Sequence, residues 1–222
     1  MRKLDRTAAL LPRCLSKYTH LTHTWDDVHS YDKRKIWNEL YKVQGRLCVY
    51  CEGKAERGNG HGHIEHFFHK GEDRFKCWTF EWSNLFGCCD SRDHCGHFKD
   101  QTLPGGIKMS YIPEELIKPD IDDPDDFFQF SPTGKIKEKD NISEEKKKRA
   151  LSTISALNLG CSELNSNREA QINRFRERLL VLTSIELIDD ATINLVKEQF
   201  QKILDEAMNS IYRTALKQAI TW

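Results

Sequence analysis

Residues 48–100 read CVYCEGKAERGNGHGHIEHFFHKGEDRFKCWTFEWSNLFGCCDSRDHCGHFKD, and this stretch determines how the rest of the chain is interpreted. It holds six of the nine histidines and six of the eight cysteines of the protein. Thiolates and imidazoles are the side chains that bind zinc and related metals. A chain that places most of them in a quarter of its length is predicted to build a metal site there.

The cysteines of this stretch form two groups. Cys48 and Cys51 are separated by two residues, a spacing typical of a zinc knuckle and also of a redox pair. Cys88, Cys89 and Cys95 form the second group. Between the groups, residues 63–68 are rich in Ile and Phe and predict a short strand. Two cysteine groups that enclose a strand favour zinc over redox chemistry.

Composition places the protein among soluble chains that need no disulfides. Charged residues make up 31% of the 222 residues, and the mean hydropathy is −0.66. No apolar run approaches the length of a membrane span. The apolar part of the N-terminus, residues 8–11, is too short for a signal peptide. We therefore expect a cytoplasmic protein without a membrane partner, whose cysteines are metal ligands or buried thiols.

The charge is balanced overall but unevenly distributed. Residues 1–47 carry ten Lys or Arg against five Asp or Glu, which is +5. Residues 48–105 carry seven against nine, and residues 106–140 carry five against nine. Proteins that bind nucleic acid tightly on their own usually have a strongly basic surface. This chain is basic only at its N-terminus, which leaves room for a partner that supplies binding.

The flanking segments are predicted to be mostly helical. Residues 1–47 form an N-terminal helical segment, with a helix over 30–45 that Gly45 ends. The metal-binding core follows at 48–105, and an irregular extension with short strands at 106–140. Residues 141–222 form a helical region, with a capping box at Asn141 and Glu144 and a helix over 167–182. Asp189 or Asp190 is predicted to cap a last helix that includes Ile211. The apolar stripes of this region are either core or a docking surface.

The residues of the central stretch resemble the HNH nucleases. The resemblance rests on Glu65-His66, on Asn84-Leu85 followed five residues later by a cysteine, and on a further cysteine with a His and a Lys just beyond it. It implies an α+β fold with a ββα-metal core, which is a β-hairpin packed on a helix around a divalent cation. It also implies a structural Zn²⁺ on four cysteines, Cys48, Cys51, Cys89 and Cys95. Cys88 competes with Cys89 for the third position.

Further strings are similar to one HNH subfamily, the PtuB type of retron- and Septu-associated anti-phage systems. These are the N-terminal MRKLDR, IEHF at 64–67, WSNLFGC at 82–88, LIKPD at 116–120 and DPDDFF at 123–128. The resemblance covers most of residues 1–140. It implies a PtuA-type ATPase partner, and it is compatible with a retron reverse transcriptase and its noncoding DNA as further components.

The resemblance assigns roles to individual residues. His66 is expected to be the general base, Glu65 a ligand of a catalytic Mg²⁺ or Mn²⁺, and Asn84 the residue that holds the hairpin loop and orients the base. His97 is the expected second ligand, although the family usually places this residue directly after the last cysteine, where Gly96 stands, so His94 is an alternative. Lys99 is expected to contact phosphate.

Several assignments stay open or weaker. Lys70 and Arg74 are candidate nucleic-acid contacts, and His61, His63 and His69 are expected to bind no metal, with His63 the best placed of the three to line the site. The expected substrate is DNA, with RNA or tRNA as the alternative, because the same residues would cut both. The non-enzymatic alternative is a zinc ribbon that binds nucleic acid or protein, in which Glu65 and His66 would be dispensable.

Overall fold

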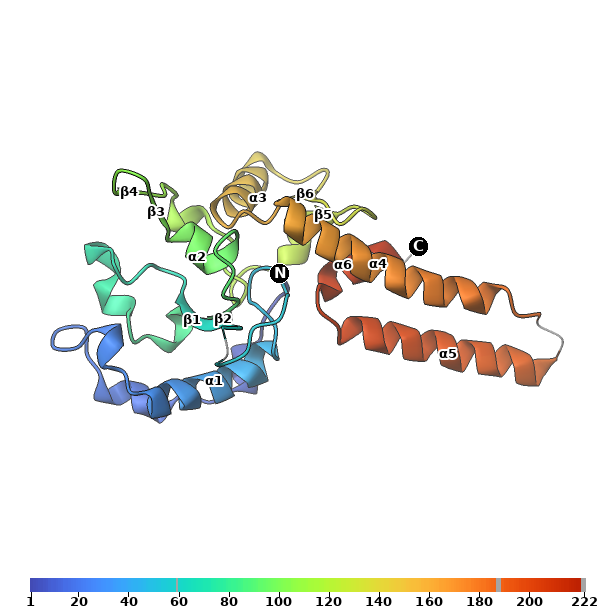
Figure 1. The fold of residues 1–222 in the computed structure, drawn as a ribbon, viewed down its shortest axis with the longest axis horizontal. Helices are drawn as coiled ribbons and strands as arrows, with labels where there is room; N and C mark the ends of the chain where they lie inside the picture. The colour runs from blue at the N-terminus through green and yellow to red at the C-terminus, as the bar shows by residue number, and fades with distance from the viewer. Residues whose placement is uncertain (59, 187–188, 221–222) are drawn as a thin grey trace.

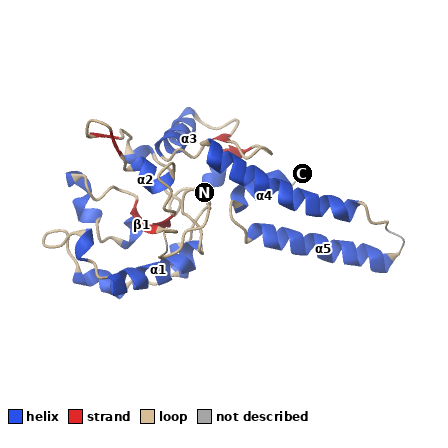
Figure 2. Cartoon of the chain, viewed as in Figure 1, coloured by secondary structure: helices blue, strands red, loops and turns tan. Residues whose placement is uncertain are grey.

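A computed structural model describes residues 1–58, 60–186 and 189–220 as a mixed α+β protein (Figures 1 and 2). The helices are α1 (Ser30–Gln44), α2 (Cys95–Lys99), α3 (Glu144–Ala156), α4 (Ser162–Thr183), α5 (Asp190–Met208) and α6 (Arg213–Ile220). The strands are β1 (His63–His66), β2 (Leu85–Cys88), β3 (Thr102–Leu103), β4 (Ile107–Lys108), β5 (Phe128–Phe130) and β6 (Ile136–Glu138). They pair in sequence order as three antiparallel two-stranded sheets.

The helix predicted over residues 30–45 is confirmed as α1. Ile36, Leu40 and Val43 recur at helical spacing and are all buried. The helix ends at Gly45, whose φ of +68° is a conformation that glycine adopts without a Cβ clash. Trp37 packs against the backbone of Gly87 in β2, where a Cβ would lie 2.6 Å from the indole ring. This close approach explains why β2 has a glycine at its centre.

Strands β1 and β2 form a hairpin that carries His63, Glu65 and His66 on β1. Their register pairs His63 with Cys88 and His66 with Leu85. Because side chains alternate along a strand, His63 and Glu65 lie on one face of β1, whereas Ile64 and His66 lie on the other. Ile64 belongs to the apolar cluster around α1. The face with His63 and Glu65 is the one that meets α2.

The C-terminal helices differ in their limits from the sequence-based prediction. The capping box predicted at Asn141 and Glu144 is wrong, because helix α3 begins at Glu144 and its cap is Ser143, whose side chain accepts a hydrogen bond from Lys146 N. Helix α4 begins at Ser162, five residues before the predicted start. Asp189 caps α5, as expected. The prediction that this last helix includes Ile211 is wrong, because α5 ends at Met208. The backbone then changes direction at Tyr212, whose φ is +56°.

The largest apolar cluster joins segments from both ends of the described chain. It contains Leu4, the cysteine-bearing loops, the residues before β5, and Ala215 and Leu216 of α6. A smaller cluster packs α1 against Trp25 and Leu85. Helices α4 and α5 run antiparallel and extend away from this body (Figure 1). The larger cluster therefore supports the candidate metal-binding residues, and only the distal parts of α4 and α5 project beyond it.

Candidate metal centre

Four buried cysteines come together as the resemblance implies. The Sγ atoms of Cys48, Cys51, Cys89 and Cys95 all lie within 4.8 Å of one another. Cys48 Sγ lies 3.8 Å from Cys95 Sγ, and Cys51 Sγ lies 3.9 Å from Cys89 Sγ. Zinc–sulfur bonds of about 2.3 Å place the sulfurs of a tetrahedral site about 3.8 Å apart. These four cysteines can therefore hold a structural zinc ion.

The backbone around the cysteines is shaped to aim the thiols inward. The Cys48–Cys51 turn is closed by Glu52 N, which donates to Cys48 O at 3.0 Å, and Gly53 N donates to Cys51 Sγ at 3.3 Å. Cys95 has a φ of +63°, a left-handed conformation that costs a non-glycine residue energy. The N–H of Cys95 donates to the carbonyl oxygen of Leu157 at 2.8 Å, so the C-terminal end of α3 holds the backbone of Cys95 in place.

The structure separates the two competing cysteines and the two competing histidines. Cys88 lies 3.7 Å from Cys48 and accepts a hydrogen bond from Gly96 N at 3.4 Å, but it is outside the cluster of four. His94 lies beside the cysteines, with Nδ1 3.1 Å from Cys95 Sγ. His97 lies elsewhere, in a second group of ligands.

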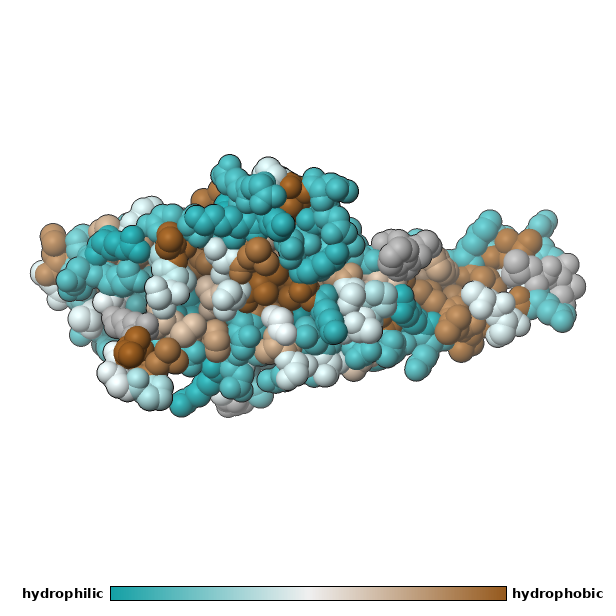
Figure 3. Space-filling view, turned by 90° about the horizontal axis from the view of Figure 1, so that it is seen from above, coloured by the Kyte–Doolittle hydropathy of each residue, from teal (hydrophilic) through white to brown (hydrophobic). Residues whose placement is uncertain are grey.

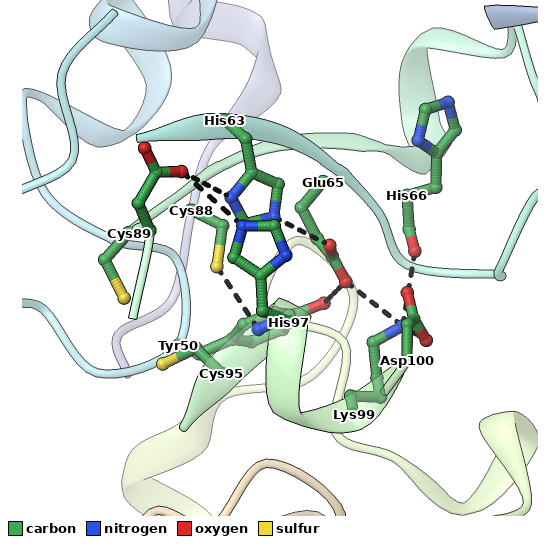
Figure 4. A network of polar contacts seen from close by, with 12 residues as sticks. Tyr50, His63, Glu65, His66, Cys88, Cys89, Cys95, His97, Lys99 and Asp100 are labelled. Atoms are coloured by element: carbon green, nitrogen blue, oxygen red, sulfur yellow. Dashed lines mark hydrogen bonds and ion pairs between the residues drawn. The ribbon is translucent and has the colours of Figure 1, made fainter. Parts of the chain in front are cut away.

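This second group consists of His63, Asp90 and His97, whose ligand atoms also lie within 4.8 Å of one another. Asp90 Oδ1 is 3.1 Å from His63 Nδ1 and 3.6 Å from His97 Nε2. The imidazole rings of His63 and His97 lie next to each other, with 4.0 Å between their centroids (Figure 4). Ligands about 2.1 Å from a cation are about 3.0–3.4 Å from one another. Two imidazoles and a carboxylate at these distances can hold a divalent cation.

The three residues come from the hairpin and from the helix that faces it. His63 opens β1, Asp90 follows β2, and His97 lies in α2, two residues after the zinc-cluster residue Cys95. The four-cysteine cluster ties the same loops together. A zinc ion there would hold the second cluster in place.

Glu65 lies behind His63 and is not one of the three. Its Oε2 is 3.3 Å from His63 Nε2, and its Oε1 is 3.1 Å from Lys99 Nζ (Figure 4). Burial would raise the pKa of Glu65, but Lys99 and His63 hold it well below its ordinary value. Carboxylates that accept a hydrogen bond from the remote nitrogen of a metal-binding histidine fix its tautomer and orientation. Glu65 has the geometry of such an orienting group.

Gly96 explains why Glu65 can take this position. A Cβ at residue 96 would lie 2.3 Å from Glu65 Oε2. A side chain at this position would displace the carboxylate from His63. The contact between Glu65 and His63 therefore requires the glycine.

His66 is separated from the cluster by the strand itself. Its ring points away from Glu65 and His97 (Figure 4), packs edge-on against Trp25 at 4.5 Å between ring centroids, and donates from Nε2 to Thr79 O at 3.1 Å. Its exposed fraction is 2%. Burial and the charge of Lys70 lower the pKa of His66 to about 3, so the ring is neutral at working pH.

This buried imidazole predicts a pH dependence of stability. The pKa of His66 is about 3 in the folded protein and about 6.5 in an unfolded chain. Protonation therefore favours unfolding, and stability falls as the pH drops from 6.5 towards 3, by at most about 1.4 kcal/mol per pH unit. Wild type and His66→Gln are unfolded in urea at about pH 7, 6 and 5, and the free energy of unfolding should fall less with pH in the variant than in wild type. Equal losses would contradict the prediction, and the zinc cluster common to both cancels in the difference.

Asn84 holds the loop between the strands. Its Oδ1 accepts from Phe68 N at 2.7 Å, and its Nδ2 donates to Phe68 O at 3.1 Å and to Trp78 O at 3.0 Å. The side chain is fully buried. Asn84 thus makes the loop contacts expected of it, but it reaches His66 only through the loop that contains Thr79.

The candidate nucleic-acid contacts do not form one surface. Lys99 is fully buried and its Nζ contacts Glu65, Asp100 and Tyr111. Arg74 is exposed and pairs with Glu72 and Glu114. Lys70 is half-buried and lines a hollow beside Trp25 and Thr79. In this conformation Lys99 serves the Glu65 network and is inaccessible to phosphate.

Two residues of the second cluster were not anticipated as ligands. His63 was expected to bind no metal, and Asp90 was assigned no role. The spacing of His63 and Glu65, two residues apart on a predicted strand, was the available signal, because it places them on one face. Asp90 has no such signal, since only folding brings the end of β2 to His63.

No family model matches the chain, and the search of curated proteins found no match. Among the described helices, none combines the length and the apolar character that crossing a membrane requires.

Proposed function

We propose that this protein is a metal-dependent endonuclease of the HNH type that hydrolyses phosphodiester bonds in DNA. The observation that carries the proposal is the cluster of His63, Asp90 and His97 between a β-hairpin and α2, beside four cysteines that can hold zinc. This arrangement supports the HNH proposal, although its ligand set replaces the expected Glu65 with His63 and Asp90. A cation at such a position polarises a phosphate and stabilises the leaving oxygen.

The protein's own residues would prepare the site for that cation. Asp90 supplies the negative charge, and Glu65 orients His63 through its Nε2–H. Lys99 in turn fixes Glu65. Two imidazoles with one carboxylate suit Mn²⁺ or another first-row transition metal better than Mg²⁺, which prefers oxygen ligands. Of the two expected catalytic cations, Mg²⁺ and Mn²⁺, we therefore favour Mn²⁺.

His66 remains the proposed general base. Its Nε2–H donates to Thr79 O, which leaves Nδ1 as the unprotonated acceptor. Catalysis would require this ring to reach the attacking water from the opposite face of β1. Hydrogen bonds of catalytic residues are often absent before substrate binds. The role of His66 as the general base is therefore tested by a separate variant, His66→Ala.

A second function is supported by a different observation. Both His66 and Lys99 are buried, and Lys99 neutralises Glu65. These features fit a zinc-stabilised module that binds nucleic acid or protein without cutting it. In that case the His63 cluster would be a second structural site.

The biological setting follows from the resemblance alone. We propose that the nuclease acts in the cytoplasm as the effector of an anti-phage system of the retron or Septu type, with a PtuA-type ATPase beside it. The sparse basic charge fits a nuclease that depends on its partner for substrate. Robust cleavage by the isolated chain would contradict this dependence.

The test is a cleavage assay on plasmid DNA and on total tRNA with Mn²⁺ or Mg²⁺, with and without the neighbouring ATPase. It compares wild type with His97→Ala, Asp90→Asn and His66→Ala, and with His61→Ala as an exposed control in the same stretch. We expect cleavage of DNA with Mn²⁺, at least about 10³-fold slower in His97→Ala and Asp90→Asn and unchanged in His61→Ala.

The outcomes distinguish a DNA nuclease, an RNA nuclease and a zinc module that does not cut. Cleavage of tRNA alone would move the substrate to RNA while keeping the site. Cleavage that survives His66→Ala but not His97→Ala would keep the cation site and remove His66 as the base. If no combination cuts while zinc is still bound, the nuclease proposal fails and the zinc-module function takes its place.

A further inference from the structure

The far ends of α4 and α5 leave many apolar side chains exposed to solvent, because packing the two helices against each other does not cover them. Beyond Arg176 in α4, and up to Phe200 in α5, none of the large apolar side chains that the structure describes is buried. They are Leu179, Leu180, Val181, Leu182, Ile185, Ile193, Leu195, Val196 and Phe200. Leu180 is 65% exposed and Leu195 is 54% exposed. We call residues 174–186 and 189–203 the arm.

The apolar side chains of the arm line a groove. It has a volume of about 460 Å³ and is bordered by Leu179, Leu182, Val196 and Phe200 of the arm and by Ile220 of α6. Figure 3 shows apolar side chains along the part of the molecule that extends away from the body. Helix pairs reach stable packing when further helices complete the bundle around their apolar stripes.

The arm also carries charge of opposite sign at its two ends. The tip, where α5 begins, has Glu186, Asp189 and Asp190. The end nearer the body has Arg174, Arg176 and Arg178 on α4, with Glu177 between them, so this run is positive overall. In this second group Arg178 already pairs with Glu206 at 2.6 Å, and Arg176 donates to Ala219 O at 3.4 Å. Arg174 and Glu186 are both exposed.

We propose that a second copy of this chain covers the arm, so that two arms pack antiparallel into a four-helix bundle. In a two-fold dimer each surface meets its own copy. Antiparallel overlap would place the acidic tip of one arm beside the arginines of the other, twice. The charge pattern is therefore complementary to itself in this orientation, whereas parallel overlap would place like charges together.

The available area sets the expected strength. The arm includes residues 190–203 of α5, which are about 21 Å long at 1.5 Å per residue, and two helices are about 20 Å wide. The arm therefore offers about 420 Å² per copy, or about 840 Å² in total, which is the size of a weak or transient interface. A dimer with a dissociation constant of about 1–10 μM is expected.

Sedimentation velocity of the full chain from about 0.1 to 100 μM tests the proposal. Wild type should convert from monomer to dimer within this range. Leu180→Glu/Leu195→Glu should weaken dimerisation at least about 100-fold. Both side chains are mostly exposed in the single copy, so the fold should be kept, which circular dichroism checks. Leu151→Glu, at a 45% exposed position of α3, is the matched control and should dimerise like wild type.

A charge exchange tests the orientation. Arg174→Glu should weaken the dimer about tenfold, and Arg174→Glu/Glu186→Arg should restore it to within about threefold of wild type. A chain that stays monomeric at all concentrations would overturn the proposal. The same holds if the monomer instead binds the ATPase through the arm. A dimer that is insensitive to Leu180→Glu/Leu195→Glu would overturn it too. The inference is independent of the nuclease proposal, because no arm residue belongs to either metal cluster.

Discussion

Replacing Cys51 by serine should release one zinc ion per chain and unfold the metal-binding core. Structural zinc contributes about 10–16 kcal/mol to folding in zinc-finger peptides. That is as much as the whole stability of a typical domain, about 5–15 kcal/mol. The hairpin has only four residues in each strand, and isolated hairpins of this kind are marginal in water. We therefore expect the core to depend on the metal.

Zinc content by mass spectrometry and near-ultraviolet circular dichroism measure this effect. Cys77→Ser is the matched control, because Cys77 is exposed and outside the cluster. Cys88→Ser should also keep the zinc, whereas Cys89→Ser should lose it. The opposite pattern for these two variants would exchange their roles. A Cys51→Ser protein with full zinc and an unchanged spectrum would show that the cluster holds no structural metal.

Replacing Lys99 by methionine should destabilise the protein by about 3–5 kcal/mol. The Lys99 ammonium is fully buried, 3.1 Å from Glu65 Oε1 and 2.7 Å from Asp100 Oδ1. Burial would lower the pKa of Lys99, but the two carboxylates raise it, so the lysine stays charged. Without it two carboxylates remain in a buried site with no cation between them. The cost is mainly that of the unpaired charges.

The double variant Lys99→Met/Glu65→Gln separates charge from packing. Removing Glu65's charge as well should recover at least about 1 kcal/mol relative to the sum of the single changes. Lys137→Met is the control, since Lys137 pairs with Asp140 on the surface, and it should change the free energy of unfolding by less than about 0.5 kcal/mol. Urea unfolding of wild type, Lys99→Met, Glu65→Gln, the double variant and Lys137→Met measures these differences. Additive single and double effects would show that Lys99 acts through packing alone.

Local patterns of the sequence were sufficient for several elements. The spacing of Ile36, Leu40 and Val43 predicted α1, and Gly45 predicted its end, because both depend on interactions within a few residues. The HNH resemblance implied the cluster of four, and the knuckle spacing of Cys48 and Cys51 suits such a site. Asn84 was expected to hold the hairpin loop, and it does so with three hydrogen bonds. That the core is an HNH ββα-metal fold stays a prediction.

Other features depended on contacts between distant parts of the chain. Asp90 joins His63 only because β2 pairs antiparallel with β1 and ends beside it. Glu65 and Lys99 form a buried pair because the glycine at 96 leaves room for the carboxylate. The strand pleat placed His66 and Glu65, adjacent in sequence, on opposite faces. The sequence by itself therefore determined which side chains could bind metal. The tertiary structure decided which of them meet, because strand pairing and helix packing bring together residues that no local pattern links.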